Sequence, residues 1–150
     1  MINKIVVEGP NNVGKTSLVN RLMNVHGLNT WKVIHMTGND DNSFKHYDEL
    51  FGTDENIIFD RAHVGEMIYP KIYGRKSTLT EKEFLELCRK YKDKILYIFV
   101  NANINFVIKA NANKNERFNQ SEFLTEQFEF LQYSQKIEDI TCSILKIYNK

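Results

Sequence analysis

The sequence predicts an α/β fold of three layers, in which helices cover both faces of a five-stranded parallel sheet. Short apolar runs alternate with longer amphipathic stretches, which is the pattern of repeated strand–helix–strand units. The apolar runs are continuous rather than alternating, as expected of strands that are covered on both faces. The expected strands are residues 4–8, 32–36, 56–60, 95–100 and, with the weakest pattern, 143–148.

Helices are expected between these strands. The first runs from Lys15 to Val25 with one apolar face, and Gly27 is placed to end it in the left-handed conformation. The sequence Thr-Glu-Lys-Glu at 80–83 is the pattern of a capping box and predicts a helix start. Further helices are expected from Phe44 to Leu50, after Arg61, from Asn103 or Asn105 to Ala110, and from Ser121 onward.

Length and composition limit the class of protein. The 150 residues are 42% hydrophobic, which is enough for one domain with one sizeable core. Twenty basic and 19 acidic residues leave a formal charge of +1, so neither a nucleic-acid polymer nor a membrane is expected as the main partner. The longest strongly apolar run, at 95–100, is too short to span a bilayer, and we expect a cytoplasmic protein. Cys88 and Cys142 are both expected to be buried apolar residues.

The strongest functional signal directly follows the first strand. Residues 9–16, Gly-Pro-Asn-Asn-Val-Gly-Lys-Thr, match the pattern G-x-x-x-x-G-K-T between an apolar strand and an amphipathic helix, which is the setting of a phosphate-binding loop. The backbone N–H groups of such a loop and the helix N-terminus face an anion. Lys15 would reach the β- and γ-phosphates of ATP, and the Thr16 hydroxyl would bind Mg²⁺. The residues expected to bind the cofactor are Gly9, Asn12, Val13, Gly14, Lys15, Thr16 and Ser17.

An Asp-Arg pair at the end of the third strand indicates a kinase rather than another class of P-loop protein. A regulatory GTPase would need an N-K-x-D element, which the sequence lacks. In the P-loop kinase topology, with strand order 2-3-1-4-5, the third strand neighbours the first, so Asp60 would lie beside the loop. Asp60 could then hold Mg²⁺ together with Thr16, and Arg61 could bind a second phosphate. The alternative is a helix-capping Asp60 followed by an exposed Arg61.

These two motifs, Glu8–Thr16 and Phe59-Asp60-Arg61 with the Gly-Glu-x-x-Tyr of 65–69, resemble those of thymidylate kinases and related deoxynucleoside kinases, especially the short phage-type members. The resemblance implies that Lys15 and Thr16 hold ATP and Mg²⁺ and that Arg61 binds the phosphate of the acceptor. It also implies a basic lid at residues 111–120, with Arg117 as a catalytic cation beside Lys109 and Lys114. The sequence departs from the family at Asn11, where an acid is usual, and in its short, arginine-poor lid.

The acceptor is expected beyond the second and third strands. Phe44 and Tyr47 would border a slot for a nucleobase, and Glu66 and Tyr69 lie three residues apart on the helix after Arg61. For Phe44 and Tyr69, ordinary core packing is an equal alternative, as is a solvated loop position for Arg75. The residues expected to bind the acceptor are Glu8, Asn11, Phe44, Tyr47, Arg61, Glu66, Tyr69 and Arg75. His35 and His63 are expected to be packed or hydrogen-bonded rather than catalytic.

Three functions remain open from the sequence. The first is ATP- and Mg²⁺-dependent phosphoryl transfer to a (deoxy)nucleoside monophosphate, with Lys15, Asp60, Arg61 and Arg117 as catalytic residues and Thr16 and Asp60 as metal ligands. The second is a deoxynucleoside kinase that acts on the 5′-hydroxyl, for which Glu8, Asp40 or Asp41 would be the carboxylate base. The third is a nucleotide-binding protein without efficient transfer. A small-molecule nucleotide or nucleoside is the expected partner, and a homodimer is left open.

Overall fold

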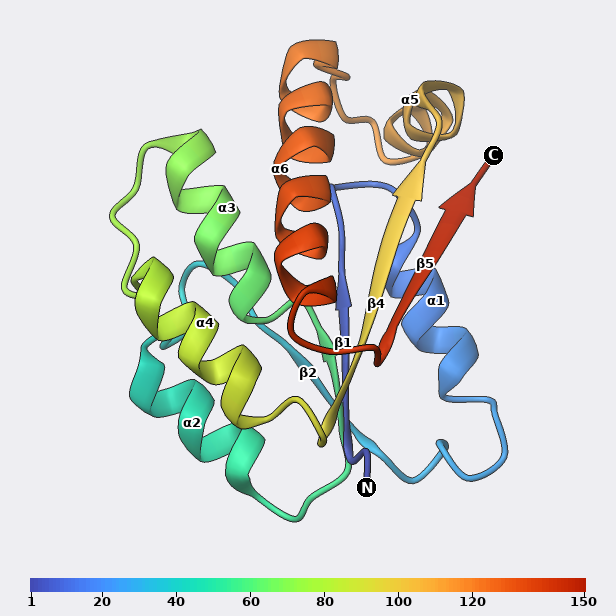
Figure 1. The fold of residues 1–150 in the computed structure, drawn as a ribbon. Helices are drawn as coiled ribbons and strands as arrows, with labels where there is room; N and C mark the ends of the chain where they lie inside the picture. The colour runs from blue at the N-terminus through green and yellow to red at the C-terminus, as the bar shows by residue number, and fades with distance from the viewer.

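The computed structural model describes all 150 residues and places five strands in one parallel sheet of order β2-β3-β1-β4-β5 (Figure 1). Every neighbouring pair of strands is parallel. The predicted fold class and strand order are therefore confirmed. The strands are β1 (Lys4–Glu8), β2 (Lys32–His35), β3 (Ile57–Asp60), β4 (Ile95–Ala102) and β5 (Ile144–Asn149).

Six helices form the two outer layers. They are α1 (Lys15–Leu22), α2 (Phe44–Gly52), α3 (His63–Tyr73), α4 (Glu81–Lys90), α5 (Ile104–Asn113) and α6 (Gln120–Glu138). α2, α3 and α4 cover one face of the sheet together with α6, and α1 and α5 lie on the other side (Figure 1). None of the helices combines the length and the apolar composition that crossing a membrane would require.

The central strand separates two hydrophobic clusters because its successive side chains point to opposite faces. Val6 of β1 is buried in the larger cluster, with residues from α2, α3, α4 and α6. Ile5 and Val7 are buried in the smaller cluster, with residues from α1 and α5. All five residues of β1 are buried. The carboxyl end of β1 is thus fixed in the middle of the sheet, and the chain leaves it directly into the predicted phosphate-binding loop.

Several helix boundaries differ from the sequence prediction. α1 ends at Leu22, and Gly27, at φ +91°, lies in the turns beyond the helix rather than at its cap. α5 is capped by Asn103, not Asn105, and continues to Asn113. α6 is capped by Asn119, so it begins before Ser121. The capping box of Thr80 and Glu83 is present as predicted.

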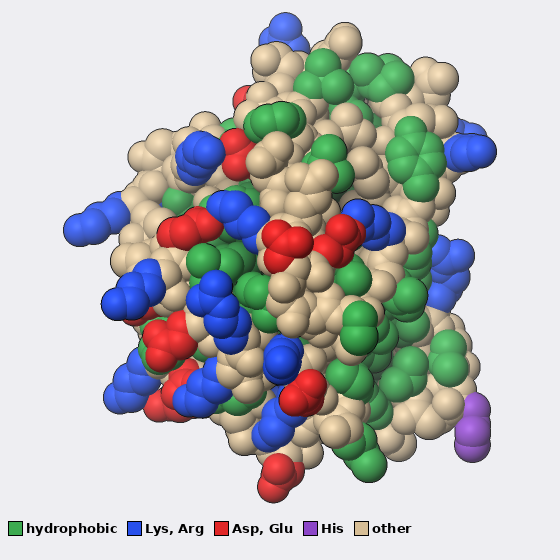
Figure 2. Space-filling view, viewed as in Figure 1, with side chains coloured by type: hydrophobic (Ala, Val, Ile, Leu, Met, Phe, Trp, Pro, Cys, Tyr) green, Lys and Arg blue, Asp and Glu red, His purple; other side chains and the backbone are tan.

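The prediction for the cysteines is half right. Cys88 is buried, whereas Cys142 is exposed because it lies in the short turn between α6 and β5. The surface agrees with the formal charge of +1, because basic and acidic side chains are interspersed over α3, α4 and α6 on the face in Figure 2.

Candidate functional site

The loop of residues 9–14 joins β1 to α1 at the carboxyl edge of the sheet, and its curvature depends on glycine. Gly14 has φ +101°, and a Cβ atom there would lie 2.9 Å from Nδ2 of Asn149. The same Nδ2 donates a 2.7 Å hydrogen bond to the carbonyl oxygen of Val13, so the end of β5 supports the loop. Asn12 also has a positive φ, +65°, a conformation that asparagine adopts more readily than most residues. The loop therefore curves as an anion-binding loop requires.

Lys15 lies inside this curve. Its ammonium donates hydrogen bonds to the carbonyl oxygens of Gly9 at 2.8 Å and Pro10 at 2.5 Å. Burial, and secondly the positive charge of Arg61, lower the pKa of Lys15 to about 8. The side chain is therefore held within the loop, where a bound phosphate would replace the carbonyl oxygens as its partner.

Thr16 and Asp60 come together beside Lys15. The Thr16 hydroxyl donates a 2.9 Å hydrogen bond to Oδ2 of Asp60, and Nδ1 of His35 lies 3.0 Å from the same oxygen. No group of three or more His, Cys, Asp and Glu side chains forms a protein-only metal site. Mg²⁺ in phosphotransferases commonly takes one or two protein carboxylates, substrate phosphates and water. The hydroxyl and carboxylate of Thr16 and Asp60 fit that donor set.

Arg61 is held over the same region by two neighbours. Its guanidinium carbon lies 4.1 Å from the centre of the Tyr69 ring, and Nη2 donates a 3.0 Å hydrogen bond to Oδ1 of Asn11. Its backbone has φ +73°, a strained conformation for arginine, and its N–H bonds to the carbonyl oxygen of Val7. The β3–α3 junction therefore directs this side chain toward the loop and not into bulk solvent.

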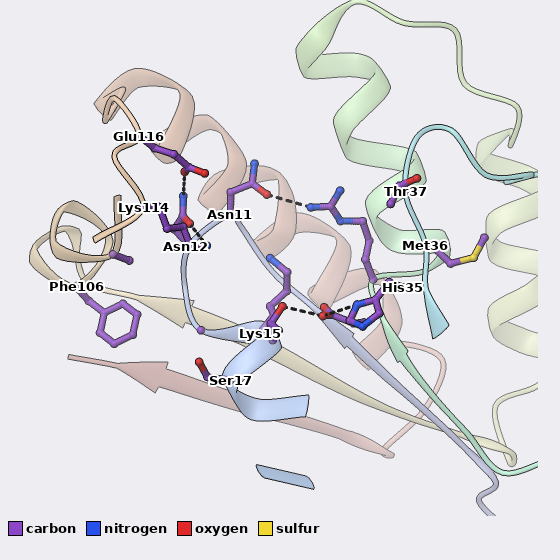
Figure 3. Close-up of a pocket in the computed structure, with 15 residues that line it drawn as sticks. Asn11, Asn12, Lys15, Ser17, His35, Met36, Thr37, Phe106, Lys114 and Glu116 are labelled. Atoms are coloured by element: carbon purple, nitrogen blue, oxygen red, sulfur yellow. Dashed lines mark hydrogen bonds and ion pairs between the residues drawn. The ribbon is translucent and has the colours of Figure 1, made fainter. Parts of the chain in front are cut away.

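These groups share one cavity of about 730 Å³. One end is lined by His35, Met36 and Thr37 beyond β2, and the other by Phe106 and Lys114 of α5 and the turn after it (Figure 3). Only three of its 15 lining residues are hydrophobic. The phosphate-binding loop lies between the two ends, so the cavity has room for a ligand on each side of it.

Comparison with solved structures identifies the fold. YorR from Bacillus subtilis, solved in complex with phosphorylated GDP, has a TM-score of 0.71 and 18% identity, with 97% of this chain and 84% of that chain covered. Deoxyadenosine kinase from M. mycoides with bound dATP has a TM-score of 0.56 and 15% identity, covering 96% and 89%. A gluconokinase from Sinorhizobium meliloti also has a TM-score of 0.56, with 14% identity and coverage of 97% and 82%.

The chain has the P-loop kinase fold. Kinases of different acceptors share this fold, so the likeness by itself does not select an acceptor. The sequence matches no protein-family model and no curated protein.

Several residues expected at the acceptor side of this kinase fold do not line the cavity. Tyr47 is fully buried, and its hydroxyl donates a 2.5 Å hydrogen bond to Asn42. Phe44 packs against the larger hydrophobic cluster. Tyr69 is buried beneath Arg61, with its hydroxyl 3.3 Å from the carbonyl oxygen of Gly9. Tyr69 therefore supports Arg61 from below, Phe44 and Tyr47 belong to the packing of the core, and none of the three lines an open slot for a base.

Glu66 and Arg75 bind each other. Both guanidinium nitrogens Nη1 and Nη2 of Arg75 donate to the Glu66 carboxylate, at 3.1 and 2.8 Å. The carboxylate is buried, and a buried charge needs such a partner. Arg75 thus pairs with Glu66 although its own side chain remains partly exposed, and neither residue lines the cavity.

Glu8 also faces away from the cavity. Its Oε2 accepts hydrogen bonds from the backbone N–H groups of Ala62 at 3.1 Å and Gly65 at 3.0 Å. Burial raises the pKa of Glu8 to about 7, although these hydrogen bonds and the charge of Arg61 oppose the change. Glu8 thus fixes the first turn of α3, directly after Arg61, and does not reach the substrate space.

The expected lid is only partly a loop. Residues 111–113 belong to α5, and Asn111 is buried, contrary to the prediction that this stretch is too polar to pack. The Asn12 amide of the loop donates to Asn111 at 2.5 Å and to Glu116 at 3.2 Å, and Lys114 donates to Asn12 at 2.7 Å. Polar contacts with the phosphate-binding loop thus satisfy the polar part of this segment, and Phe118 packs against the smaller hydrophobic cluster.

The lid cations lie in different places. Lys114 lines the main cavity with Lys15, whereas Arg117 lines a separate hollow beside Glu122 and Tyr73. Arg117 does not line the cavity that contains Lys15.

Glu126 of α6 was missed by the sequence reasoning. Its carboxylate is buried and accepts hydrogen bonds from the backbone N–H of Asn11 and the hydroxyl of Tyr73, both at 2.9 Å. One signal could have found it, because Glu126 lies on the buried side of α6 between Phe123 and Phe130. A carboxylate on an apolar helix face requires a polar partner elsewhere in the fold.

Proposed function

We propose that this protein transfers the γ-phosphoryl group of ATP to a (deoxy)nucleoside monophosphate, in the manner of a thymidylate kinase. One observation supports the proposal most directly: Lys15, the Thr16–Asp60 pair and Arg61 border a single cavity although they come from two distant segments, the start of α1 and the end of β3 with the residue after it. Phosphoryl transfer requires mainly positioning and neutralisation of charge. The converging cations neutralise charge, and the loop, which is hydrogen-bonded to Asn149, Glu126 and Asn111, positions the phosphates.

Each residue has a separable task in this proposal. The N–H groups of the loop cradle the donor phosphates, and Lys15 exchanges its carbonyl partners for β- and γ-phosphate oxygens. Thr16 and Asp60 hold Mg²⁺, which neutralises the phosphates and orients them when bound. Arg61 binds the phosphate of the acceptor and brings it in line with the γ-phosphoryl group. Lys114 faces the phosphates from the lid side of the cavity.

An assay of ADP release tests the proposal. Wild-type protein with Mg-ATP would be given a panel of nucleoside monophosphates, the matching nucleosides, and no acceptor. We expect acceptor-dependent ADP release with at least one monophosphate, its loss in Lys15→Ala, and no comparable rate with the nucleoside. If the folded protein binds Mg-ATP but none of the acceptors causes release of ADP, the transfer reaction is refuted and nucleotide binding alone is supported.

A second candidate is transfer to a hydroxyl group of a small polar acceptor. It is favoured because two residues expected to bind a base are already paired within the protein: Tyr47 is hydrogen-bonded to Asn42, and Glu66 to Arg75. The acceptor end of the cavity is mostly polar, and Met36 is the only hydrophobic residue there. Adding nucleosides and small polyols to the same panel separates this candidate from the first.

A further inference from the structure

The cavity has an aromatic end for which the proposed phosphate chemistry gives no task. Phe106, in the first turn of α5, is the only Phe, Tyr or Trp among the 15 lining residues. The Asn103 side chain accepts a 2.9 Å hydrogen bond from the backbone N–H of Phe106, which fixes the start of the helix. The ring is partly buried against the smaller hydrophobic cluster. Its position is thus set by local structure rather than by a ligand.

Phe106 also contacts the phosphate-binding loop. Its Cζ and Cε1 atoms lie 3.6 and 3.8 Å from the point where a Cβ atom on Gly14 would stand. The ring therefore lies beside the loop at the end of the cavity opposite His35, Met36 and Thr37 (Figure 3).

Three residues of this part of the chain border the cavity at a spacing of four. They are Phe106, Ala110 and Lys114, which lie on one side of α5 and its C-terminal cap. Their order is an aromatic ring, a small side chain and a cation. The Lys114 ammonium already contacts the loop through Asn12 at 2.7 Å. A nucleotide has the same order of chemistry, from its flat base through its sugar to its phosphates.

We propose that Phe106 is the platform on which the base of the donor nucleotide stacks. Ala110 leaves space for the ribose, and Lys114 lies on the phosphate side. This inference rests on the proposed function, because it requires the loop to hold the donor phosphates. Stacking on an aromatic ring accepts any base, so Phe106 distinguishes nucleoside triphosphates from inorganic polyphosphate and does not select adenine.

Calorimetric titration of the whole protein with two probes tests the platform. Mg-ATP contains a base and Mg-tripolyphosphate does not. Phe106→Ala should weaken binding of Mg-ATP by roughly tenfold, as expected for one lost base–aromatic contact, and leave binding of Mg-tripolyphosphate unchanged. Phe106→Trp should retain most of the affinity for Mg-ATP. Ile108→Ala is the matched control, because Ile108 is exposed on the same helix and does not line the cavity.

Folding is controlled by Phe106→Leu, which keeps an apolar side chain against Gly14 and loses only the aromatic face. Its Mg-ATP affinity should fall as in Phe106→Ala while its thermal unfolding stays close to wild type. Equal losses for both probes, or wild-type Mg-ATP affinity in Phe106→Ala, would overturn the platform and leave the proposed function standing. Failure of the wild-type protein to bind either probe would instead refute the proposed function, and the platform with it.

Discussion

Replacing Arg61 by alanine tests whether the acceptor carries a phosphate, and the structure separates its effects on stability and on function. In the free protein the guanidinium makes one hydrogen bond, to Asn11, and one cation–π contact, with Tyr69. A partly exposed cation–π contact contributes about 0.5–1 kcal/mol. The strained backbone at φ +73° remains in alanine, so the substitution relieves nothing. We therefore expect a loss of about 1 kcal/mol in the free energy of unfolding.

The functional loss should be larger. An acceptor phosphate partly shielded from water would lose its ion pair with the guanidinium, at a cost of roughly 3–5 kcal/mol in kcat/KM for the acceptor. The acceptor KM should rise and kcat should fall, whereas the affinity for Mg-ATP alone should change little. Arg61→Lys should recover only part of the loss, because lysine keeps the charge without the two-pronged geometry.

Steady-state kinetics with the best acceptor, together with calorimetry for Mg-ATP, measure these quantities. Arg89→Ala is the control for removing one positive charge, because Arg89 is exposed on α4 and does not line the main cavity. A fall in kcat at a nearly constant acceptor KM would indicate a hydroxyl acceptor without a phosphate. Wild-type kinetics for every acceptor would remove Arg61 from the site and refute the reasoning.

Three further predictions concern the loop, the β1 carboxylate and the lid. Lys15→Ala should remain folded, bind Mg-ATP far more weakly and transfer almost nothing, because a charge-assisted contact with the phosphates is lost; unchanged turnover would contradict the loop assignment. Because burial raises the pKa of Glu8 from 4.5 to about 7, its contribution to stability is full below pH 4.5 and is lost as the pH rises toward 7. The free energy of unfolding, measured by urea denaturation, should fall by about 3 kcal/mol between pH 4.5 and 7 in the wild type and by much less in Glu8→Gln. An equal fall in both proteins would exclude Glu8 as its source. Residues 111–120 should become resistant to limited proteolysis when donor and acceptor bind together, and equal cleavage rates with and without ligands would count against a lid.

The features that sequence predicted well depend on local chemistry or on the topology of the sheet. Continuous apolar runs alternating with amphipathic stretches were sufficient for the parallel sheet, and the motif around Lys15 determined the strand order through the fold it belongs to. The capping box at Thr80 needs only residues within one turn, so it could be read directly. Asp60 and Thr16 are 44 residues apart, but the topology alone places them at one edge of the sheet.

The features that sequence did not predict depend on pairing across the fold. Asn111 belongs to a polar stretch, and nothing nearby in the chain shows that its side-chain oxygen accepts a hydrogen bond from the Asn12 amide. Glu66 was expected to bind the acceptor because it shares a helix face with Tyr69. In the structure the chain bends after α3, and Arg75 binds the Glu66 carboxylate. A buried carboxylate can be noticed in the sequence, but its partner is known only from the structure.

Asn11 stands where the thymidylate kinase motif that this sequence resembles usually has an acid, and the amide preserves positive charge where the proposed reaction needs it. Asn11 uses its side-chain oxygen to accept the hydrogen bond from Arg61, while its backbone N–H binds Glu126. An aspartate at this position would form an ion pair with Arg61 and neutralise the guanidinium before any acceptor arrived. It would also place a second carboxylate near that of Glu126, at a cost in repulsion. The amide orients Arg61 without either effect, so the full positive charge of the guanidinium remains available to an anionic acceptor.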